Sequence, residues 1–373
     1  MRVVLAHHGY GGAIAGAETM VRAVSEHLVA RGHQVLMVSV DGCAGVAGGA
    51  GDGCAGVAGG AGVEGGAGHG MPIVRLPPGD PSQLAALLPW HPDIVHVHDL
   101  AHAATAEAAA GLAGVLEVPL LVTPATEMSL WEDREKGIAL CRRADAVLIL
   151  TGGEEAALAA VGVSRGRLER VPQAPWLTGT PDPAGFRARH GLVGPMVLFC
   201  GRKARFKGYH LLLEAAPLVW RQYPEARMVF IGPRWDPDAA AVFARHADQR
   251  ILELGVVDEH DKHSAMAACD LLCVPSTADV FPLVIAEAWA CAKAVVAGSF
   301  AGEAGVIAHG VDGLVTDGQP AALAQAIVGL LGDPTRRAAM GTAGRDRAMS
   351  WDAVADRLEE IYLRVMGDQR CTR

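Results

Sequence analysis

Residues 270–288 read Asp-Leu-Leu-Cys-Val-Pro-Ser-Thr-Ala-Asp-Val-Phe-Pro-Leu-Val-Ile-Ala-Glu-Ala. The apolar run that ends at Pro275 predicts a buried strand, and Pro282 fits the first turn of a helix, where its missing N–H costs nothing. Such a helix start offers free N–H groups and a partial positive charge to an anion. Asp279 precedes this helix start, and Glu287 lies inside the helix. Two carboxylates around a phosphate-binding helix start indicate a ligand with hydroxyls at both ends and phosphates between, which describes a nucleotide sugar.

The same spacing also fits a strand, a loop and a helix that hold no ligand. In that interpretation Asp279 is a solvated cap of the helix and Glu287 is a surface glutamate. Spacing within this one stretch does not separate the two interpretations, so other parts of the chain have to decide.

A cluster of cations supplies a second indication. Met196–Cys200 predicts a strand, and the following segment reads Gly-Arg-Lys-Ala-Arg-Phe-Lys-Gly over residues 201–208, before a helix that starts at Tyr209. Three or four cations between a strand end and a helix start predict a site for a diphosphate, with Arg202 and Lys207 as its main ligands. The alternative is a solvated basic turn.

Composition limits the class of protein. A length of 373 residues predicts about two domains. A net charge of -9 argues against a general nucleic-acid or anionic-membrane surface, so no nucleic-acid partner is expected. The eight cysteines include no C-x-x-C pair, and Cys269 and Cys273 fit the core of a fold. No run of about 18 apolar residues occurs, and the N-terminal strand is too short for a signal peptide. We therefore expect a cytoplasmic protein without an integral membrane segment.

The N-terminal part has the pattern of a doubly wound α/β sheet. A strand over residues 3–6 leads into a glycine-containing loop, a helix that ends near Arg31 and a second strand over residues 34–40. A dinucleotide-binding dehydrogenase is a weak alternative, because Ile14 stands where the fingerprint needs its third glycine. Residues 41–70 contain tandem glycine-rich repeats, which predict a flexible loop.

The motifs resemble family 4 of the retaining glycosyltransferases over nearly the whole chain. That family carries two glutamates separated by seven residues, and here Asp279 and Glu287 occupy those places. The basic turn over residues 201–208 is similar to the family's Gly-Arg…Lys-Gly turn, and Gly16-Ala-Glu18 is similar to its opening loop. Relatives also carry a sugar-contacting histidine after the strand that ends at Thr123, but this chain has Ala125 there.

The resemblance implies the GT-B architecture, in which two Rossmann-like doubly wound α/β domains face a cleft. We therefore expect an acceptor-side domain over residues 1–180 and a donor-side domain over residues 181–350. A C-terminal helix over residues 351–373 would cross back to the first domain.

The same resemblance assigns roles to individual residues. Those expected to act in catalysis are Arg202, Lys207, Asp279 and Glu287. Those expected to contact the donor are Gly16, Gly201, Val256, Phe281, Leu283 and Val284. Those expected near the acceptor or the sugar are Gly12, His98, Thr126 and Glu127.

The implied activity is transfer of a sugar, with retention, from a UDP- or GDP-type donor to a small hydroxylated acceptor. No cofactor and no metal are expected, because cations and a helix dipole stabilise the leaving diphosphate in relatives. We also expect His96 and His98 to face opposite sides of their strand, which would prevent joint chelation. Two alternatives stay open: a catalytically weak nucleotide-sugar binding protein, and a related enzyme that uses a cyclitol donor.

Overall fold

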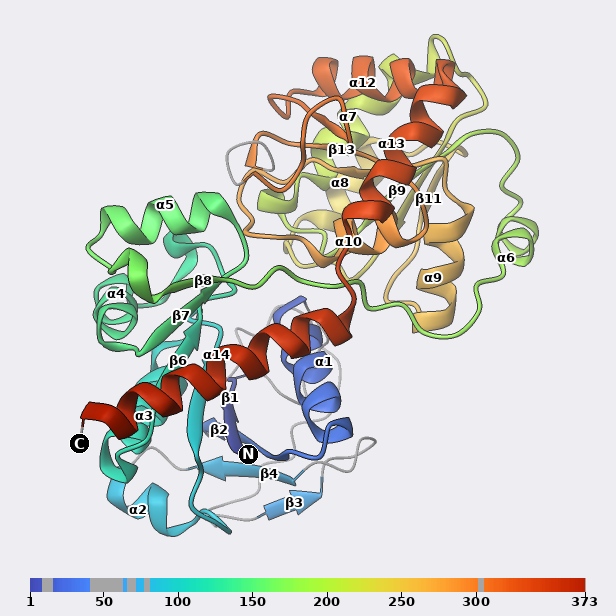
Figure 1. Cartoon of the computed structure of the whole chain (residues 1–373). Coiled ribbons are helices and arrows are strands. Elements are labelled where there is room, and N and C mark those ends of the chain that lie inside the picture. The colour runs from blue at the N-terminus through green and yellow to red at the C-terminus, as the bar shows by residue number, and fades with distance from the viewer. Residues whose placement is uncertain (9–15, 41–62, 66–71, 77–80, 301–304, 373) are drawn as a thin grey trace. The chain divides into compact units, whose positions relative to one another are not determined.

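The computed structural model describes residues 1–8, 16–40, 63–65, 72–76, 81–300 and 305–372 (Figure 1). The chain divides into two compact units. Of the described residues, the first unit holds those up to Gln173 and those from Ser350 onward, and the second holds those between Ala174 and Met349. The division after Gln173 lies seven residues before the boundary that the sequence suggested at residue 180.

The first unit is built on an eight-stranded sheet in the order β3-β4-β2-β1-β5-β6-β7-β8. Neighbouring strands are parallel, except that β3 runs antiparallel to β4. The inner strands are continuous apolar runs because both faces of a parallel sheet are covered; Val3, Val4 and Leu5 are fully buried. The strands are β1 (Arg2–Ala6), β2 (Gln34–Val40), β3 (Val63–Gly65), β4 (Pro72–Leu76), β5 (Ile94–His98), β6 (Leu120–Thr123), β7 (Ala146–Ile149) and β8 (Leu168–Arg170).

The short strand β3 corrects one expectation. It lies inside the glycine-rich segment that the sequence predicts as a flexible loop, and its backbone pairs with β4. The tandem repeat over residues 41–62 lies outside the described residues.

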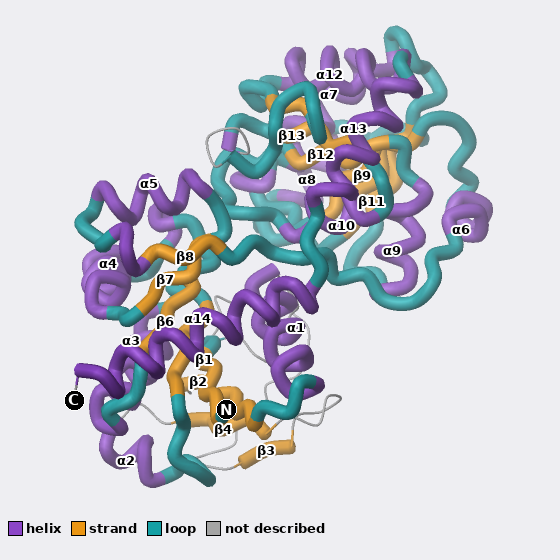
Figure 2. The backbone as a smooth tube through the Cα atoms, in the orientation of Figure 1, coloured by secondary structure: helices purple, strands orange, loops and turns teal. Residues whose placement is uncertain are grey.

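Helices flank the first sheet (Figure 2). They are α1 (Gly16–Ala30), α2 (Pro81–Ala86), α3 (Ala103–Leu116), α4 (Arg134–Arg143), α5 (Gly152–Ala160) and α14 (Trp351–Thr372), with short 3₁₀ turns η1 (Met128–Leu130) and η2 (Arg165–Arg167). The C-terminal helix α14 packs beside α1 and belongs to the first unit. Its Tyr362 is fully buried, and the Tyr362 hydroxyl lies 2.7 Å from Nδ1 of His96 on β5.

The second unit holds a six-stranded parallel sheet in the order β11-β10-β9-β12-β13-β14. Its strands are β9 (Met196–Cys200), β10 (Arg227–Ile231), β11 (Ile251–Glu253), β12 (Leu271–Val274), β13 (Ala294–Ala297) and β14 (Leu314–Val315). Its helices are α6 (Pro183–Arg189), α7 (Tyr209–Trp220), α8 (Ala239–Arg245), α9 (Glu259–Ala268), α10 (Leu283–Ala290), α12 (Pro320–Gly332) and α13 (Pro334–Arg347), with the 3₁₀ turn η3 (Arg205–Lys207). Cys269 and Cys273 are free and buried in its core, as expected.

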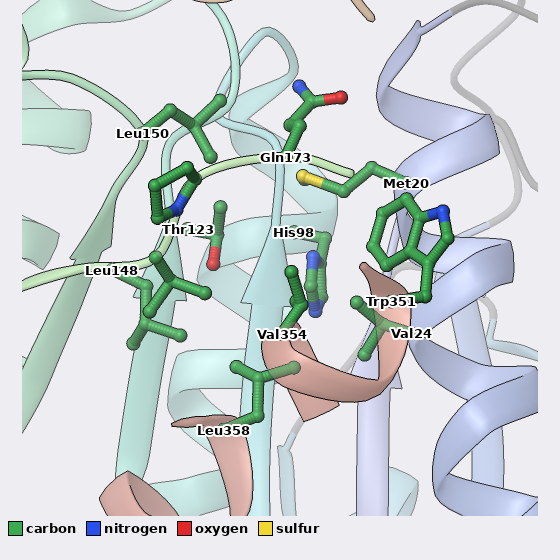
Figure 3. A pocket seen from close by; sticks show the side chains of 12 residues that line it. Met20, Val24, His98, Thr123, Leu148, Leu150, Gln173, Trp351, Val354 and Leu358 are labelled. Atoms are coloured by element: carbon green, nitrogen blue, oxygen red, sulfur yellow. The ribbon is translucent and has the colours of Figure 1, made fainter. Parts of the chain in front are cut away.

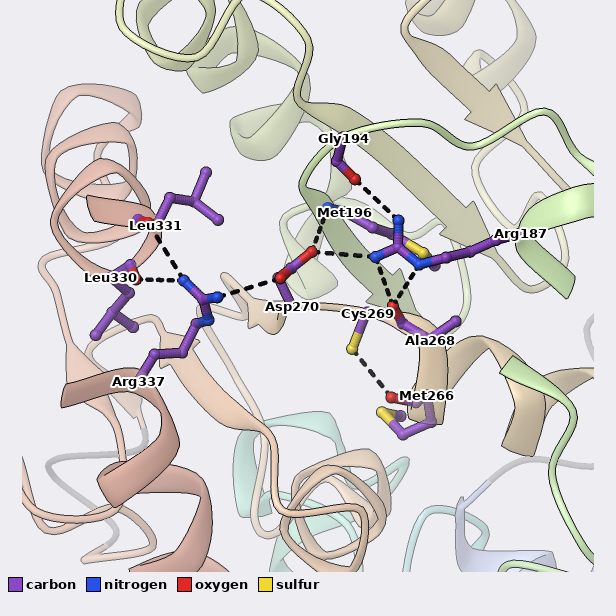
Figure 4. Close-up of polar contacts among 10 residues, drawn as sticks. All are labelled: Arg187, Gly194, Met196, Met266, Ala268, Cys269, Asp270, Leu330, Leu331 and Arg337. Carbon is purple, nitrogen blue, oxygen red and sulfur yellow. Dashed lines mark hydrogen bonds and ion pairs between the residues drawn. The ribbon is translucent and has the colours of Figure 1, made fainter. Parts of the chain in front are cut away.

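One carboxylate ties several elements of this unit together (Figure 4). Asp270, just before β12, accepts hydrogen bonds from the Met196 backbone N–H at 2.8 Å and from Arg187 of α6 at 3.1 Å. Its other oxygen accepts from Arg337 of α13 at 3.2 Å. Asp270 thereby fixes the starts of the central strands β9 and β12 against two helices.

The order of strands reverses once in each sheet. In the first sheet the chain proceeds outward from β1 in one direction and from β5 in the other, and in the second sheet it does so from β9 and β12. Because the connections on either side of such a point diverge, a crevice forms outside the carboxyl ends of the two strands, where α/β folds bind ligands. The residues that follow β1, β5, β9 and β12 are therefore the ones placed to form a binding site.

Candidate functional site

The loops that follow β9 and β12 are joined to one another. The Thr277 backbone N–H donates to the Phe206 carbonyl at 2.8 Å. Gly208 has a φ of 74°, and a Cβ at this position would lie 2.1 Å from the Pro275 carbonyl oxygen. Only glycine fits such a conformation and such a close approach. The basic turn and the stretch from Pro275 to Pro282 therefore form one surface.

Lys207 and Asp279 meet on this surface. The Lys207 Nζ lies 2.5 Å from Asp279 Oδ2, and their side chains are 21% and 13% exposed. Asp279 is not a cap of α10, because that helix begins at Leu283 and Pro282 is its N-cap residue, without a side-chain hydrogen bond. Pro282 thus lies one residue outside the helix that the sequence placed it in. The solvated-cap interpretation of Asp279 is wrong.

The other cations of the basic turn have different environments. The Arg202 guanidinium lies over the Trp235 ring, with Cζ 4.7 Å from the ring centroid. Arg205 is paired with Asp238 at 2.6 Å on the surface. Arg202 and Lys207 follow β9 as the sequence placed them, and their contact with a diphosphate stays a prediction.

Lys203 is fully buried, which sequence reasoning missed because a lysine in a glycine-containing loop resembles a solvated one. Its ammonium donates to the Gly232 carbonyl and, at 2.5 Å, to the Leu254 carbonyl, and it lies 3.6 Å from the Glu253 carboxylate. Burial lowers the pKa of Lys203 to about 8, against the opposing effect of Glu253. Lys203 therefore joins the ends of β9, β10 and β11 and does not face a ligand.

Glu287 lies just over one turn into α10 and is 1% exposed, so it is not a surface glutamate. Its Oε1 accepts from Lys262 of α9 at 2.9 Å. Burial raises the pKa of Glu287, and the Lys262 ammonium opposes that rise. Lys262 also lies 2.8 Å from Glu259. Sequence reasoning missed Lys262, which has no motif of its own and is identified only by its contact with Glu287.

The remaining residues expected at the donor fall into two groups. Gly201, Val256, Phe281, Leu283 and Val284 follow β9, β11 and β12 or begin α10, at the carboxyl edge of the second sheet. Val256 is 78% exposed, which leaves its side chain open to contact. Gly16 is the first residue of α1 in the first unit. Nothing in the structure tests their contact with a donor, so that role stays a prediction.

The first unit brings His98 to a small pocket (Figure 3). Its apolar lining includes Met20, Val24, Leu148, Leu150 and Trp351. His98 is 2% exposed, and neither of its ring nitrogens has a hydrogen-bond partner among the described residues. Burial, followed by the neighbouring His96, lowers the pKa of His98 well below its usual value.

His96 and His98 share one face of β5, so the expectation that they face opposite sides is wrong. Their ring centroids lie 4.0 Å apart. The physical reason is that side chains alternate along a strand, so residues two apart lie on the same face. His96 is held between the Tyr362 hydroxyl and, at 2.8 Å, Thr123 Oγ1.

The other residues expected near the acceptor or the sugar are Glu127, Thr126 and Gly12. Glu127 is the N-cap of η1, where its side chain accepts from the Ser129 N–H at 3.0 Å. The Thr126 carbonyl accepts from the Trp131 indole N–H at 2.8 Å. Gly12 lies outside the described residues. Contact of these residues with a sugar or an acceptor stays a prediction.

Side chains that follow β1 and β5 form a further cluster. His7 and His8 follow β1, and Asp99 follows β5 with a φ of 73°. The His7 and His8 rings are stacked with centroids 4.6 Å apart, and His8 also contacts His102 at 4.0 Å. Burial, then the neighbouring His102, lowers the pKa of His8 to about 4. Sequence patterns did not indicate this group, because its members follow strands that lie far apart in the chain.

Comparison with known families identifies the chain. Residues 14–174 match the family model described as Glycosyltransferase Family 4, and residues 194–333 match the one described as Glycosyl transferases group 1. The chain belongs to the family 4 glycosyltransferases. This confirms the family that the motifs after β9 and β12 predicted.

Characterised relatives of this family 4 glycosyltransferase match it in part. The phosphatidyl-myo-inositol mannosyltransferase of Mycobacterium leprae is 32% identical over 191 residues, which cover 50% of each protein. The D-inositol 3-phosphate glycosyltransferase of Kineococcus radiotolerans is 32% identical over 217 residues, covering 52% of this chain and 50% of the relative. The chain thus spans about half the length of these relatives.

Solved structures match over nearly the whole chain and confirm the α/β fold with two parallel sheets. Anabaena HepE in complex with UDP and glucose has a TM-score of 0.75 at 20% identity, covering 96% of this chain and 98% of that one. Sucrose-phosphate synthase of Thermosynechococcus elongatus has a TM-score of 0.75 at 22% identity, covering 98% and 99%. Within the described part of this family 4 member, no helix has the length and apolar character needed to cross a membrane.

Proposed function

We propose that this chain is a glycosyltransferase that moves a sugar from a nucleotide-diphosphate sugar to a hydroxyl group of an acceptor. The observation that carries the proposal is the pairing of Lys207 with Asp279 where the strand order of the second sheet reverses, with Arg202 on the same basic turn. Two cations and a carboxylate lie there on the loop surface that leads into α10. That combination suits a ligand with a diphosphate next to a sugar hydroxyl.

The Lys207–Asp279 pair is central to how the site would act. Without a ligand, each charge satisfies the other at 2.5 Å. A bound diphosphate would compete for the Lys207 ammonium and would release Asp279 to accept a hydrogen bond from a sugar hydroxyl. Donor binding would thereby exchange one internal ion pair for two contacts with the ligand.

Charge that develops on the leaving diphosphate would be stabilised by Arg202 and Lys207. A well-placed donor of this kind contributes about 3–4 kcal/mol to a transition state. The start of α10 adds N–H groups and a partial positive charge. Because these groups can supply the stabilisation of the leaving group, we propose a mechanism that is independent of metal. We further propose retention at the anomeric carbon, with the departing phosphate taking the proton of the acceptor hydroxyl, as the family resemblance implies.

The comparisons narrow the substrates to be tested. Relatives named above act on inositol-containing acceptors, and HepE was solved with UDP and glucose. We propose a UDP- or GDP-type donor and a small acceptor rich in hydroxyl groups, with inositol and its phosphate as the first acceptors to try.

The experiment begins with a thermal-shift screen of UDP- and GDP-sugars against the purified chain. A donor at 100 times its Kd adds about 2.7 kcal/mol to the stability of the folded state, which such a screen detects. Transfer to inositol or inositol phosphate is then measured for the wild type, Lys207→Ala and Arg205→Ala. Arg205 is the matched control, because it is a cation of the same turn that pairs with Asp238.

The proposal requires donor binding and transfer by the wild type, a severe loss in Lys207→Ala and little change in Arg205→Ala. Equal losses in the two variants, or normal turnover in Lys207→Ala, would overturn the assignment of the diphosphate site.

Two departures from the family pattern favour a second candidate, a nucleotide-sugar binding protein. Asp279 stands where relatives carry a glutamate, and Ala125 stands where they carry a histidine. Stable donor binding with neither transfer nor hydrolysis would support it. A rise in melting temperature only with a nucleotide-diphosphate cyclitol would instead indicate an enzyme that uses a cyclitol donor.

A further inference from the structure

The carboxyl edge of the first sheet gathers three side chains that the proposed transfer reaction does not use. His7 and His8 follow β1, and Asp99 follows β5, which is the parallel neighbour of β1. One potential ligand atom from each residue lies within 4.8 Å of the others, and His8 Nδ1 is 4.0 Å from Asp99 Oδ2. We propose that His7, His8 and Asp99 form a binding site for a first-row divalent metal ion of the Zn²⁺ type.

The three residues are enclosed and well supported. His7 is 0% and Asp99 6% exposed, and the His8 side chain is 15% exposed. Asp99 Oδ1 accepts the Ala101 backbone N–H at 2.9 Å, which fixes the orientation of the carboxylate. Hydrogen bonds of this kind from outside the ligand set hold metal-binding side chains in place.

The neighbouring strand fixes the backbone at Asp99. Its φ of 73° lies in the left-handed region, which aspartate and asparagine adopt more readily than most residues other than glycine. The Asp99 N–H donates to the Thr123 carbonyl of β6 at 2.9 Å. The fold thus holds this carboxylate in place beside the two imidazoles.

The donor set indicates which metal would bind. Two imidazole nitrogens and one carboxylate oxygen suit Zn²⁺, Co²⁺, Ni²⁺ or Fe²⁺, whereas Mg²⁺ and Ca²⁺ prefer oxygen ligands. Metal–ligand bonds of about 2.0–2.1 Å place the ligands of a tetrahedral ion roughly 3.4 Å apart. Binding would therefore bring His8 Nδ1 and Asp99 Oδ2 closer by about 0.6 Å, and the other ligand atoms by at most about 1.4 Å. Three protein ligands would leave one position of the metal open.

The neighbourhood of His8 offers further support for a bound ion. The His8 ring contacts the His102 ring, with centroids 4.0 Å apart, and His102 Nδ1 lies 3.7 Å from Glu132. A carboxylate behind a histidine next to the ligand set adds negative charge close to the cation. His102 is outside the group of three, so we assign it no ligand role.

The test uses untagged full-length chain, freed of metal, without any nucleotide sugar. Calorimetric titration with Zn²⁺ gives the affinity and stoichiometry, and titration with Co²⁺ gives the absorption bands of a nitrogen- and oxygen-ligated ion. The variants are His8→Ala and Asp99→Asn. Asparagine keeps the size of the side chain and tolerates a left-handed backbone, so Asp99→Asn leaves the fold in place. The control is His260→Ala, because Asp258, His260 and Asp261 form a second group with ligand spacing among the described residues.

We expect one ion bound per chain at this site, with the affinity lowered about 100-fold or more in both His8→Ala and Asp99→Asn, since even partners outside the ligand set contribute 10–100-fold. His260→Ala should retain the wild-type affinity. Absence of binding by the wild type, unchanged affinity in Asp99→Asn, or loss of binding in His260→Ala would each overturn the proposal. Since no nucleotide sugar is present, the result does not depend on whether the chain is a glycosyltransferase.

Discussion

Lys203 gives the sharpest quantitative prediction, because a buried ammonium with a lowered pKa makes the stability of the protein depend on pH. Replacement by methionine, Lys203→Met, keeps an unbranched side chain of similar length and removes the charge. It leaves the Gly232 and Leu254 carbonyls without the ammonium donor that they share. A buried polar group without a partner costs about 1–3 kcal/mol. Relief from burying a charge offsets part of that loss, so we expect Lys203→Met to lower the free energy of unfolding by about 1–3 kcal/mol near pH 7.5.

The pH dependence follows from the lowered pKa of Lys203. Between the folded-state value of about 8 and the ordinary value of 10.5, the unfolded chain binds more protons at this side chain than the folded chain does. Stability therefore rises with pH in this window, and it is lost again as the pH falls toward 8. A shift of this size contributes about 2 kcal/mol between pH 8 and pH 10. The variant lacks this contribution, so the deficit of Lys203→Met should widen by about 2 kcal/mol over the same range.

The measurement is urea unfolding of both proteins at pH 8 and pH 10, followed by tryptophan fluorescence. Trp289 lies buried in the second unit, 2% exposed, and reports on the unit that contains Lys203. Comparing the two proteins at each pH cancels the other groups that titrate in this range. A deficit that stays constant or shrinks from pH 8 to pH 10 would refute the argument that burial lowers the pKa of Lys203.

Three further predictions concern the proposed donor site. Arg202→Ala and Lys207→Ala should each lower kcat about 100-fold or more at unchanged melting temperature; steady-state rates near normal in both would contradict this. Asp279→Asn should keep the affinity for the bare nucleoside diphosphate and reduce only sugar-dependent turnover, whereas Glu287→Gln should weaken the binding of both the nucleoside diphosphate and the full donor. Calorimetry of both variants with both ligands checks this contrast. Normal turnover of the donor by Asp279→Asn would show that Asp279 does not contact the sugar. Chelation with EDTA should leave the transfer rate unchanged, and a complete loss that Mg²⁺ restores would show that transfer needs a metal.

The sequence by itself determined the α/β class, the family and the segments at which ligands are expected. Strands such as Met196–Cys200 and helices such as Tyr209–Trp220 are visible locally, because burial and turn formation leave a pattern within a few residues. The cations and carboxylates that follow β9 and β12 were found in the same way. The exact start of α10 was missed, since proline suits the cap position as well as the first turn, and β3 was missed because its glycine-rich surroundings predict a loop.

The tertiary structure alone decided which of these side chains face one another. Lys207 and Asp279 are 72 residues apart, and their pairing depends on β9 and β12 being neighbours in the sheet. The burial of Lys203, the partnership of Glu287 with Lys262, and the meeting of His8 with Asp99 depend likewise on packing between distant segments. Local patterns report whether a residue lies on a strand, a helix or a loop. They carry no information about the opposite charge that a distant loop supplies, and that contact determines whether a charged residue binds a ligand or supports the fold.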